Sequence, residues 1–280
     1  MMNDTDMEEL NPFKTILLAT DGSEFSAGVE QVGMEMASQH QSQLYVLRLL
    51  LSEEGSDEAS AEEQEAKIDL ERVIHQSAER GISCTPLIQF CQEPSQGILS
   101  TIKDVGAQLV ILGCRGRRGL AKLMVGDATT KVIDKAECSV LVVSRLVTSW
   151  NSGVLLALDS MEPDGDRAAL AAFHLAQSAQ VPLTILLVVD DDEVEDRENY
   201  QLLNRLVAMA KLKNLEVDSM VQSGEIDDVI LEVARQRSAD IIVCEPRDRS
   251  VIEKLFNTNK LIHLIGRARC PVMVVQGPES

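Results

Sequence analysis

Aromatic side chains are scarce in this chain, whose 280 residues include one Trp, two Tyr and five Phe. A hydrophobic core must therefore be built mainly from Leu, Val, Ile, Ala and Met. The hydrophobic share of 45% is ordinary for a globular protein, so such a core is available. At this length the chain suits one large domain or two ordinary ones.

Basic charge is also in short supply. The 45 Asp and Glu residues outnumber the 26 Lys and Arg residues, which gives a formal net charge of −19. Nucleic acids and anionic membranes are bound through basic surface, so we expect no nucleic-acid partner and no membrane partner. A small anion held by a few local donors remains compatible with this charge.

Long hydrophobic runs and paired cysteines are missing as well. No apolar run approaches the roughly 18 residues of a membrane-spanning helix, and the N-terminal MMNDTDMEELNP is too acidic for a secretory signal. No two of the six cysteines form a C-x-x-C pair, and several lie in apolar strand patterns, where a thiol behaves as a small hydrophobe. We therefore expect a cytoplasmic protein.

Short apolar runs alternate with helical periodicity from residue 14 onwards. Lys14 to Thr20 is typical of a buried parallel strand, and the turn Asp21-Gly22-Ser23 leads into a helix. Further strands are expected at 44–51, 82–90, 109–112 and 138–143, with helices at 66–79, 94–106 and after residue 126. We expect the acidic stretch 52–65 to be a solvated loop. The alternation predicts an α/β fold with a right-handed, doubly wound parallel sheet.

The pattern then restarts, with a period of roughly 135 residues. Gly153 to Leu158 repeats the first strand, Asp159 falls where Asp21 fell, and the closing CPVMVV at residues 270–275 echoes CSVLVV at residues 138–143. A repeat of this length indicates a duplicated domain rather than a solenoid. We expect two domains, residues 1–147 and 148–280, joined by a linker near Arg145 to Ser152.

Glycines punctuate the segment that follows the strand at 109–112. Gly113, Gly116 and Gly126 have the spacing G-x2-G-x9-G, and an arginine-rich loop lies between the last two. A strand, a glycine loop and a helix N-terminus together offer backbone N–H groups to an anion. With Asp21 and the closing CSVLVV, this spacing resembles the universal stress protein family. The resemblance covers most of residues 13–143 and, more weakly, residues 153–275.

The resemblance implies Rossmann-like domains of the adenine nucleotide alpha hydrolase type. Members of the family pair through their last strand, so SVLVV and PVMVV are expected to pair within this chain and to form a pseudo-dimer. It further implies that the first domain binds ATP, ADP or AMP, with the aspartate equivalent to Asp21 at the adenine-ribose end. The residues that it places at this nucleotide site are Ala19, Asp21, Leu49, Leu112, Gly113, Arg115, Gly116, Gly126, Asp127, Ala128 and Thr129.

Asp127 departs from the family pattern, because ATP-binding members continue with Ser or Thr after the third glycine. A carboxylate roughly 4 Å from a phosphate repels it by about 1 kcal/mol in water. Asp127 could instead cap or start the helix in a member that has lost ATP.

Nearby residues leave both interpretations open. Arg115, Arg117 and Arg118 could neutralise Asp127 and still bind phosphate, since guanidinium groups pair with both anions. Thr129 or Thr130 could supply the missing hydroxyl. Cys114, beside Arg115, is either a redox-sensitive thiol or a cysteine without a role.

The second domain is expected to hold no ATP. Alignment on its strand puts Cys244, Arg247 and Asn257 at the glycine positions, and only Thr258 keeps the hydroxyl. These side chains would occupy the space that a nucleotide needs.

No catalytic residue and no metal site can be assigned. Each of the four histidines (His40, His75, His174, His263) is expected to stand alone, without a carboxylate or cysteine at metal-ligand spacing. An enzyme with weak ATPase or autophosphorylation activity is therefore the least favoured of three functions. The others are a stress protein with an adenine nucleotide in its first domain, and a nucleotide-free scaffold that contacts a second copy or another protein.

Overall fold

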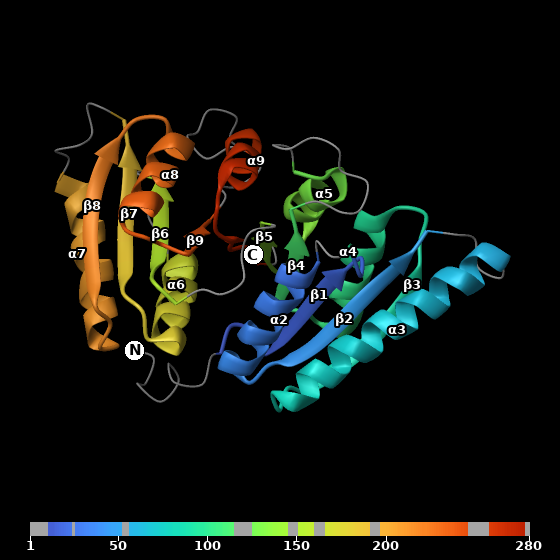
Figure 1. The fold of residues 1–280 in the computed structure, drawn as a ribbon. Coiled ribbons are helices and arrows are strands. Elements are labelled where there is room, and N and C mark those ends of the chain that lie inside the picture. The colour runs from blue at the N-terminus through green and yellow to red at the C-terminus, as the bar shows by residue number, and fades with distance from the viewer. Residues whose placement is uncertain are drawn as a thin grey trace.

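The computed structural model describes residues 11–23, 26–51, 56–114, 125–144, 151–159, 166–190, 197–245 and 258–277. We call residues 11–144 the first half and residues 151–277 the second half. The first half contains β1 (Thr15–Thr20), α2 (Ala27–His40), β2 (Gln43–Leu50), α3 (Asp57–Glu79), β3 (Cys84–Phe90), α4 (Pro94–Val105), β4 (Leu109–Gly113), α5 (Asp127–Lys135) and β5 (Ser139–Val143). The second contains β6 (Val154–Asp159), α6 (Asp166–Ala179), β7 (Leu183–Val189), α7 (Arg197–Leu212), β8 (Val217–Ser223), α8 (Ile226–Gln236), β9 (Ile241–Cys244), α9 (Thr258–Arg267) and β10 (Val272–Val274), as Figure 1 shows.

The strands of the described residues form one ten-stranded sheet in the order β3-β2-β1-β4-β5-β10-β9-β6-β7-β8. Neighbouring strands are parallel everywhere except at the centre, where β5 and β10 run antiparallel with Leu141 opposite Met273. This confirms the predicted pairing of the two closing strands. Each half therefore uses the last strand of the other to cover its own open edge.

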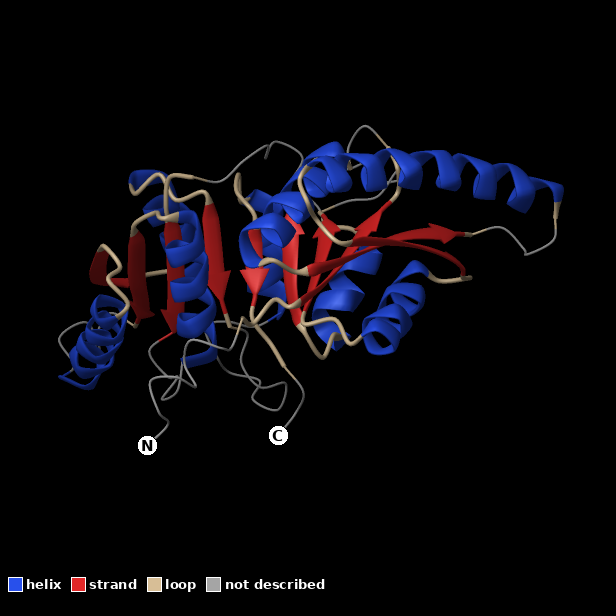
Figure 2. Ribbon diagram, turned by 90° about the horizontal axis from the view of Figure 1, so that it is seen from below, coloured by secondary structure: helices blue, strands red, loops and turns tan. Residues whose placement is uncertain are grey.

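Helices cover both faces of this sheet, as Figure 2 shows. On one face Leu18 and Leu156 pack with residues of α2, α3, α6 and α7, and on the other Leu17 and Leu155 pack with residues of α4, α5, α8 and α9. Strands that are covered on both faces must be apolar throughout, which explains the continuous Val, Ile and Leu runs in the sequence. The doubly wound α/β fold is confirmed.

The acidic stretch before residue 66 differs from the prediction. A loop was expected over residues 52–65, but α3 already begins at Asp57, where the Ser56 hydroxyl accepts a hydrogen bond from the Ala59 backbone N–H at 3.0 Å. Ala59 and Ala66 are buried on the same side of the helix as Leu70 and Val73 further along. Alanines contribute a weak hydrophobic signal, so the buried stripe is hard to see among the glutamates.

Among the described residues, none of the helices combines the length and the apolar character that crossing a bilayer requires.

Candidate functional site

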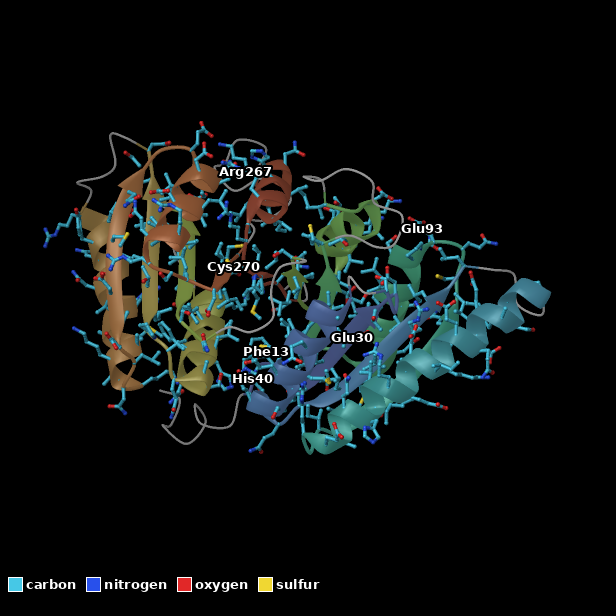
Figure 3. The ribbon with its side chains drawn as sticks, viewed as in Figure 1. Phe13, Glu30, His40, Glu93, Arg267 and Cys270 are labelled. Carbon is cyan, nitrogen blue, oxygen red and sulfur yellow. The ribbon has the colours of Figure 1, made fainter. Side chains whose placement is uncertain are left out.

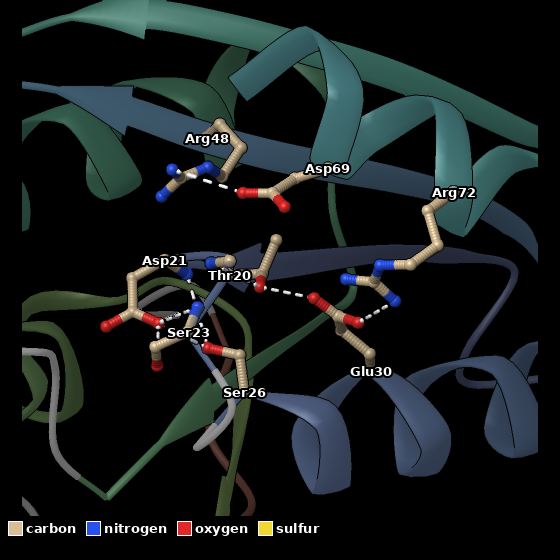
Figure 4. A network of polar contacts seen from close by, with 9 residues as sticks. Thr20, Asp21, Ser23, Ser26, Glu30, Arg48, Asp69 and Arg72 are labelled. Atoms are coloured by element: carbon tan, nitrogen blue, oxygen red, sulfur yellow. Dashed lines mark hydrogen bonds and ion pairs between the residues drawn. The ribbon is translucent and has the colours of Figure 1, made fainter. Parts of the chain in front are cut away.

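The turn after β1 holds the carboxylate of Asp21 in a fixed direction, as Figure 4 shows. Asp21 Oδ1 accepts hydrogen bonds from the Ser23 backbone N–H at 3.1 Å, the Ser23 hydroxyl at 2.6 Å and the Ser26 hydroxyl at 2.5 Å. An aspartate that accepts from residues just ahead of it forms an Asx turn, which orients the side chain before any ligand arrives.

A buried polar network connects this turn to the neighbouring helices. The Thr20 hydroxyl donates to Glu30 Oε1 at 2.7 Å and accepts from the Gly22 backbone N–H at 3.2 Å. Glu30 is 2% exposed and its Oε2 pairs with Arg72 of α3 at 2.8 Å. The turn is therefore fastened to α2 and α3, the two helices of the first half that pack on this face of the sheet (Figure 4).

Gly22 is packed closely against α3. Its φ of +66° lies in the left-handed region, and a Cβ on its backbone would lie 1.9 Å from Asp69 Oδ2. Asp69 in turn pairs with Arg48 at 3.5 Å. Only glycine fits this position without displacing the Asp69 carboxylate.

β1 and β4 separate at their carboxyl ends, next to this turn. Their pairing ends at Leu18 opposite Ile111, although the strands continue to Thr20 and Gly113. β2 and β3 lie on one side of β1 in the sheet, and β4 and β5 lie on the other side, so the strand order reverses between β1 and β4. A doubly wound sheet has its crevice at this reversal of strand order. Asp21 and Gly113 therefore lie at the same edge, as predicted.

Hydrogen bonds fasten the start of α5 to the end of β4. The Gly126 N–H donates to the Cys114 carbonyl at 2.9 Å, and the Thr129 hydroxyl donates to the Gly113 carbonyl at 3.1 Å. The Thr130 hydroxyl donates to the Gly126 carbonyl at 3.1 Å. Both threonine hydroxyl protons that could have replaced the missing Ser or Thr are thus used within the protein.

Gly126 is the N-cap of α5, so Asp127 is the first helical residue and not the cap. No side chain caps this helix. The Asp127 side chain is 83% exposed and pairs with Lys131 one turn later at 3.1 Å, and Lys131 also contacts Glu93 at 2.6 Å. That contact lowers the pKa of the Glu93 carboxyl and raises the pKa of Lys131. The carboxylate of Asp127 is therefore turned to solvent and offset by a cation.

The remaining predicted site residues fall into two groups. Ala19, Leu49 and Leu112 belong to the face of the sheet that α4 and α5 cover, and Ala128 is partly buried in the first turn of α5. Arg115 and Gly116, with Arg117 and Arg118, lie outside the described residues.

The pairing register corrects the alignment of the second half. Val154 pairs with Ile241 as Ile16 pairs with Leu109, so the residue at the position of Gly113 is Glu245 rather than Cys244. Arg247 and Asn257 lie outside the described residues.

We call the carboxyl ends of β6 and β9, the equivalent place in the second half, the second crevice, and Glu245 places a carboxylate of the protein itself there. Its side chain is 10% exposed, its Oε1 lies 2.7 Å from Arg167, and its Oε2 accepts from the Ala168 backbone N–H at 3.3 Å. Asp159, the counterpart of Asp21, is buried. The backbone donors at the start of α6 are thus partly occupied.

Two hollows in the described part of the chain lie away from the first crevice. One, of about 360 Å³, lies between α8 and α9 and includes Asp227 and His263. The other, of about 400 Å³, lies where the halves meet and includes Phe13, Arg167 and Gln276. Neither includes Asp21 or Gly126, so the case for the first crevice rests on strand order and backbone geometry.

The expectation that every histidine stands alone was wrong. His40 and His174 stack with ring centroids 5.1 Å apart, and His263 Nδ1 lies 2.5 Å from Asp227 Oδ2. No group of three or more potential metal ligands occurs among the described residues. Neither pair could be read from the sequence, because the partners lie far apart along the chain.

The cysteines mostly behave as small hydrophobes. Cys138, Cys244 and Cys270 are buried, and burial raises the pKa of the Cys138 and Cys270 thiols to about 12. Cys114 is partly buried.

Two tandem doubly wound α/β units, joined through their last strands and with a glycine-bordered crevice in the first, define a pseudo-dimer of Rossmann-like domains. The chain belongs to the universal stress protein family, whose sequence profile matches residues 12–144 and 152–276. It is a tandem member that carries the family fold twice.

Known relatives match either one half or the whole chain. A universal stress protein of Bacillus subtilis, YxiE, is 29% identical over 147 residues, which is 47% of this chain and 99% of the relative. The crystal structure of a universal stress protein from Archaeoglobus fulgidus covers 96% of this chain and 99% of its own, with a TM-score of 0.75 and 20% identity. A universal stress protein solved in complex with cAMP covers 48% of this chain and 98% of its own, at 16% identity and a TM-score of 0.39.

Proposed function

We propose that the first half binds an adenine nucleotide (ATP, ADP or AMP) in the crevice between the Asp21 turn and the start of α5. The observation that carries this proposal is the separation of β1 and β4 beside a helix whose N-cap is a glycine without a side chain. Unpaired N–H groups and the helix dipole at such an end favour a phosphate.

Each part of the ligand has a suitable partner. Asp21, already held by Ser23 and Ser26, would accept hydrogen bonds from the sugar hydroxyls. The backbone at Gly113 and Gly126 would lie along the phosphates, with Ala128 and Thr129 in the first turn of α5. Asp127 opposes this less than its charge alone suggests, because Lys131 offsets it and its side chain points to solvent.

The second half is proposed to support the first without binding a nucleotide. We propose domain boundaries at residues 1–147 and 148–280, with the open crevice in the first domain only. The Glu245 carboxylate already contacts the Ala168 N–H and Arg167 at the second crevice, and a phosphate would meet that negative charge.

Titration calorimetry with ATP, ADP and AMP on the full chain tests this proposal. Asp21→Asn should weaken the binding of the preferred nucleotide by tenfold or more, because the amide replaces one acceptor oxygen with a donor. Asp159→Asn is the matched control at the equivalent place in the second half, and this variant should bind the nucleotide with the affinity of the parent. Equal losses in both variants, or a loss in Asp159→Asn alone, would contradict the assignment to the first half.

A second function is favoured by the occupied hydroxyls of Thr129 and Thr130 and by Asp127. In this alternative both crevices are degenerate, and the protein is a nucleotide-free scaffold that contacts a second copy or another protein. Absence of heat with all three nucleotides, together with no nucleotide in mass spectra of the purified protein, would support it. Weak ATP hydrolysis or autophosphorylation would require bound ATP, so an absence of nucleotide binding would exclude both activities.

We also propose a cytoplasmic location. Six free cysteines in the described residues suit a reducing compartment.

A further inference from the structure

Three aromatic rings from both halves meet where α2 faces α6. His40, the last residue of α2, stacks on His174 of α6 with a centroid distance of 5.1 Å and an interplanar angle of 22°. Phe13 contacts both imidazoles edge-on, at 5.2 Å from His40 and 6.2 Å from His174. Figure 3 labels Phe13 and His40 at this junction.

The surroundings of this ring pair suit neutral imidazoles and not cations. His40 is 5% exposed, and its Nδ1 is buried without a hydrogen-bond partner. Its Nε2 lies 3.4 Å from the Ser178 hydroxyl. Protonation would add a second N–H donor with no acceptor facing it and would bring a charge into a buried site, which is costly.

The charged groups nearby do not compensate for such a cation. Among the described residues neither ring has a carboxylate ion-pair partner, whereas His75 and His263 do. Burial lowers the pKa of His174, and Lys213, in the turn after α7, lowers it further. On α2 itself, Glu35 is partly buried, faces Arg80 and Asp240, and has a pKa raised by burial. The carboxyl end of α2 favours a cation at His40, but the effect of burial is larger.

Burial and the neighbouring His174 lower the pKa of His40 to about 3. An exposed imidazole has a pKa of about 6.5. The pKa of His40 is lower in the closed contact than in the open one. Its contribution to the stability of the contact is therefore fully present above pH of about 6.5 and is lost as the pH falls toward 3.

We propose that the His40–His174 ring pair is a pH-sensitive contact between the two halves, which holds α2 against α6 while both imidazoles are neutral and opens in acid. The β5–β10 ladder would then remain as the connection between the halves. This inference is independent of nucleotide binding, since it involves no residue of either crevice.

Hydrogen exchange of the full chain at pH 7 and pH 5.5 tests the proposal, after correction for the intrinsic exchange rate. Protection of amides in the C-terminal turns of α2 and in α6 should fall by about tenfold from His40 alone, with a further loss from His174. Amides of α4, which is on the opposite face of the sheet, should keep their protection.

Variants separate the ring pair from general acid destabilisation. The double variant His40→Leu, His174→Leu fills the space without a titrating group, so its α2 and α6 amides should show no such fall. His75→Gln removes an exposed histidine of α3 and should keep the parent response. A fall of equal size in the double variant would overturn the proposal.

A titration of the histidine rings of the parent by NMR needs no variant. We expect His40 to stay neutral in the closed protein down to pH 5. A His40 ring that protonates near pH 6.5 while α2 and α6 keep their protection would also overturn the proposal.

Discussion

The carboxylate of Asp127 occupies the first position of α5, where a negative charge stabilises the helix dipole. The Asp127 carboxylate pairs with Lys131 and is largely exposed, so that cation and the surrounding water screen much of its charge. Its effect on a phosphate ligand is therefore smaller than the family pattern indicates.

Asp127→Ser should strengthen nucleotide binding, but by no more than about fivefold, because the charge that it removes is already offset. Calorimetric affinities of parent and variant measure this. Asp134→Ser, an exposed change at the other end of α5, should leave the affinity unchanged. A gain of a hundredfold would mean that the carboxylate points into the crevice.

Gly22 offers a test of the turn beside that crevice. Gly22→Ala combines an unfavourable positive φ with a Cβ in contact with Asp69, so the free energy of unfolding should fall by more than about 2 kcal/mol. Gly81→Ala is the matched control, because Gly81 has a φ of +69° but no atom within 4 Å, and it should lose only about 1 kcal/mol. Urea denaturation of both variants supplies the comparison. Similar losses would show that the contact with Asp69 is unimportant.

Among the elements, the strands were the easiest to predict. The runs at β1, β4 and β5 are apolar throughout because helices cover both faces of a parallel sheet, and that pattern is visible in one sequence. The start of α3 was missed, since its buried side consists partly of alanines among glutamates. The predicted equivalent of Gly113 after β9 was wrong by one residue, because no glycine follows β9 to mark the end of this short apolar strand.

Ser56→Ala tests the corrected start of α3. The Ser56 hydroxyl caps the helix through the Ala59 N–H, so its removal should lower the free energy of unfolding by about 1 kcal/mol. Ser60→Ala removes an exposed hydroxyl one turn later, and we expect a change within about 0.5 kcal/mol. Equal effects would place the start of the helix elsewhere.

At the scale of the whole molecule, the sheet and both hydrophobic clusters run through the junction of the halves. Leu141 and Val143 of β5 share one cluster with Met273 and Val275, and the opposite face does the same with Val140 and Val272. The resemblance to a family whose members pair through their last strand made this pairing predictable. The stacking of His40 on His174 was not, because it depends on how α2 meets α6 and leaves no motif in the sequence.

This shared core predicts that the two halves unfold together. Circular dichroism and the hydrogen exchange of amides in β1 and β6 should report one coincident transition in urea. Leu141→Asp would bury an unpaired charge in the shared core and should separate or abolish that transition. Two transitions in the parent would mean that the junction contributes little to stability.

The antiparallel ladder of β5 and β10 joins surfaces that belong to one polypeptide. A pair of separate chains falls apart when it is diluted, whereas here the local concentration of each mate is set by the linker and does not change with the amount of protein. The two copies are also made in a fixed ratio of one to one. Mutations can therefore accumulate in one copy alone, so a largely buried Glu245 carboxylate can persist after β9 while the equivalent position after β4 keeps a glycine.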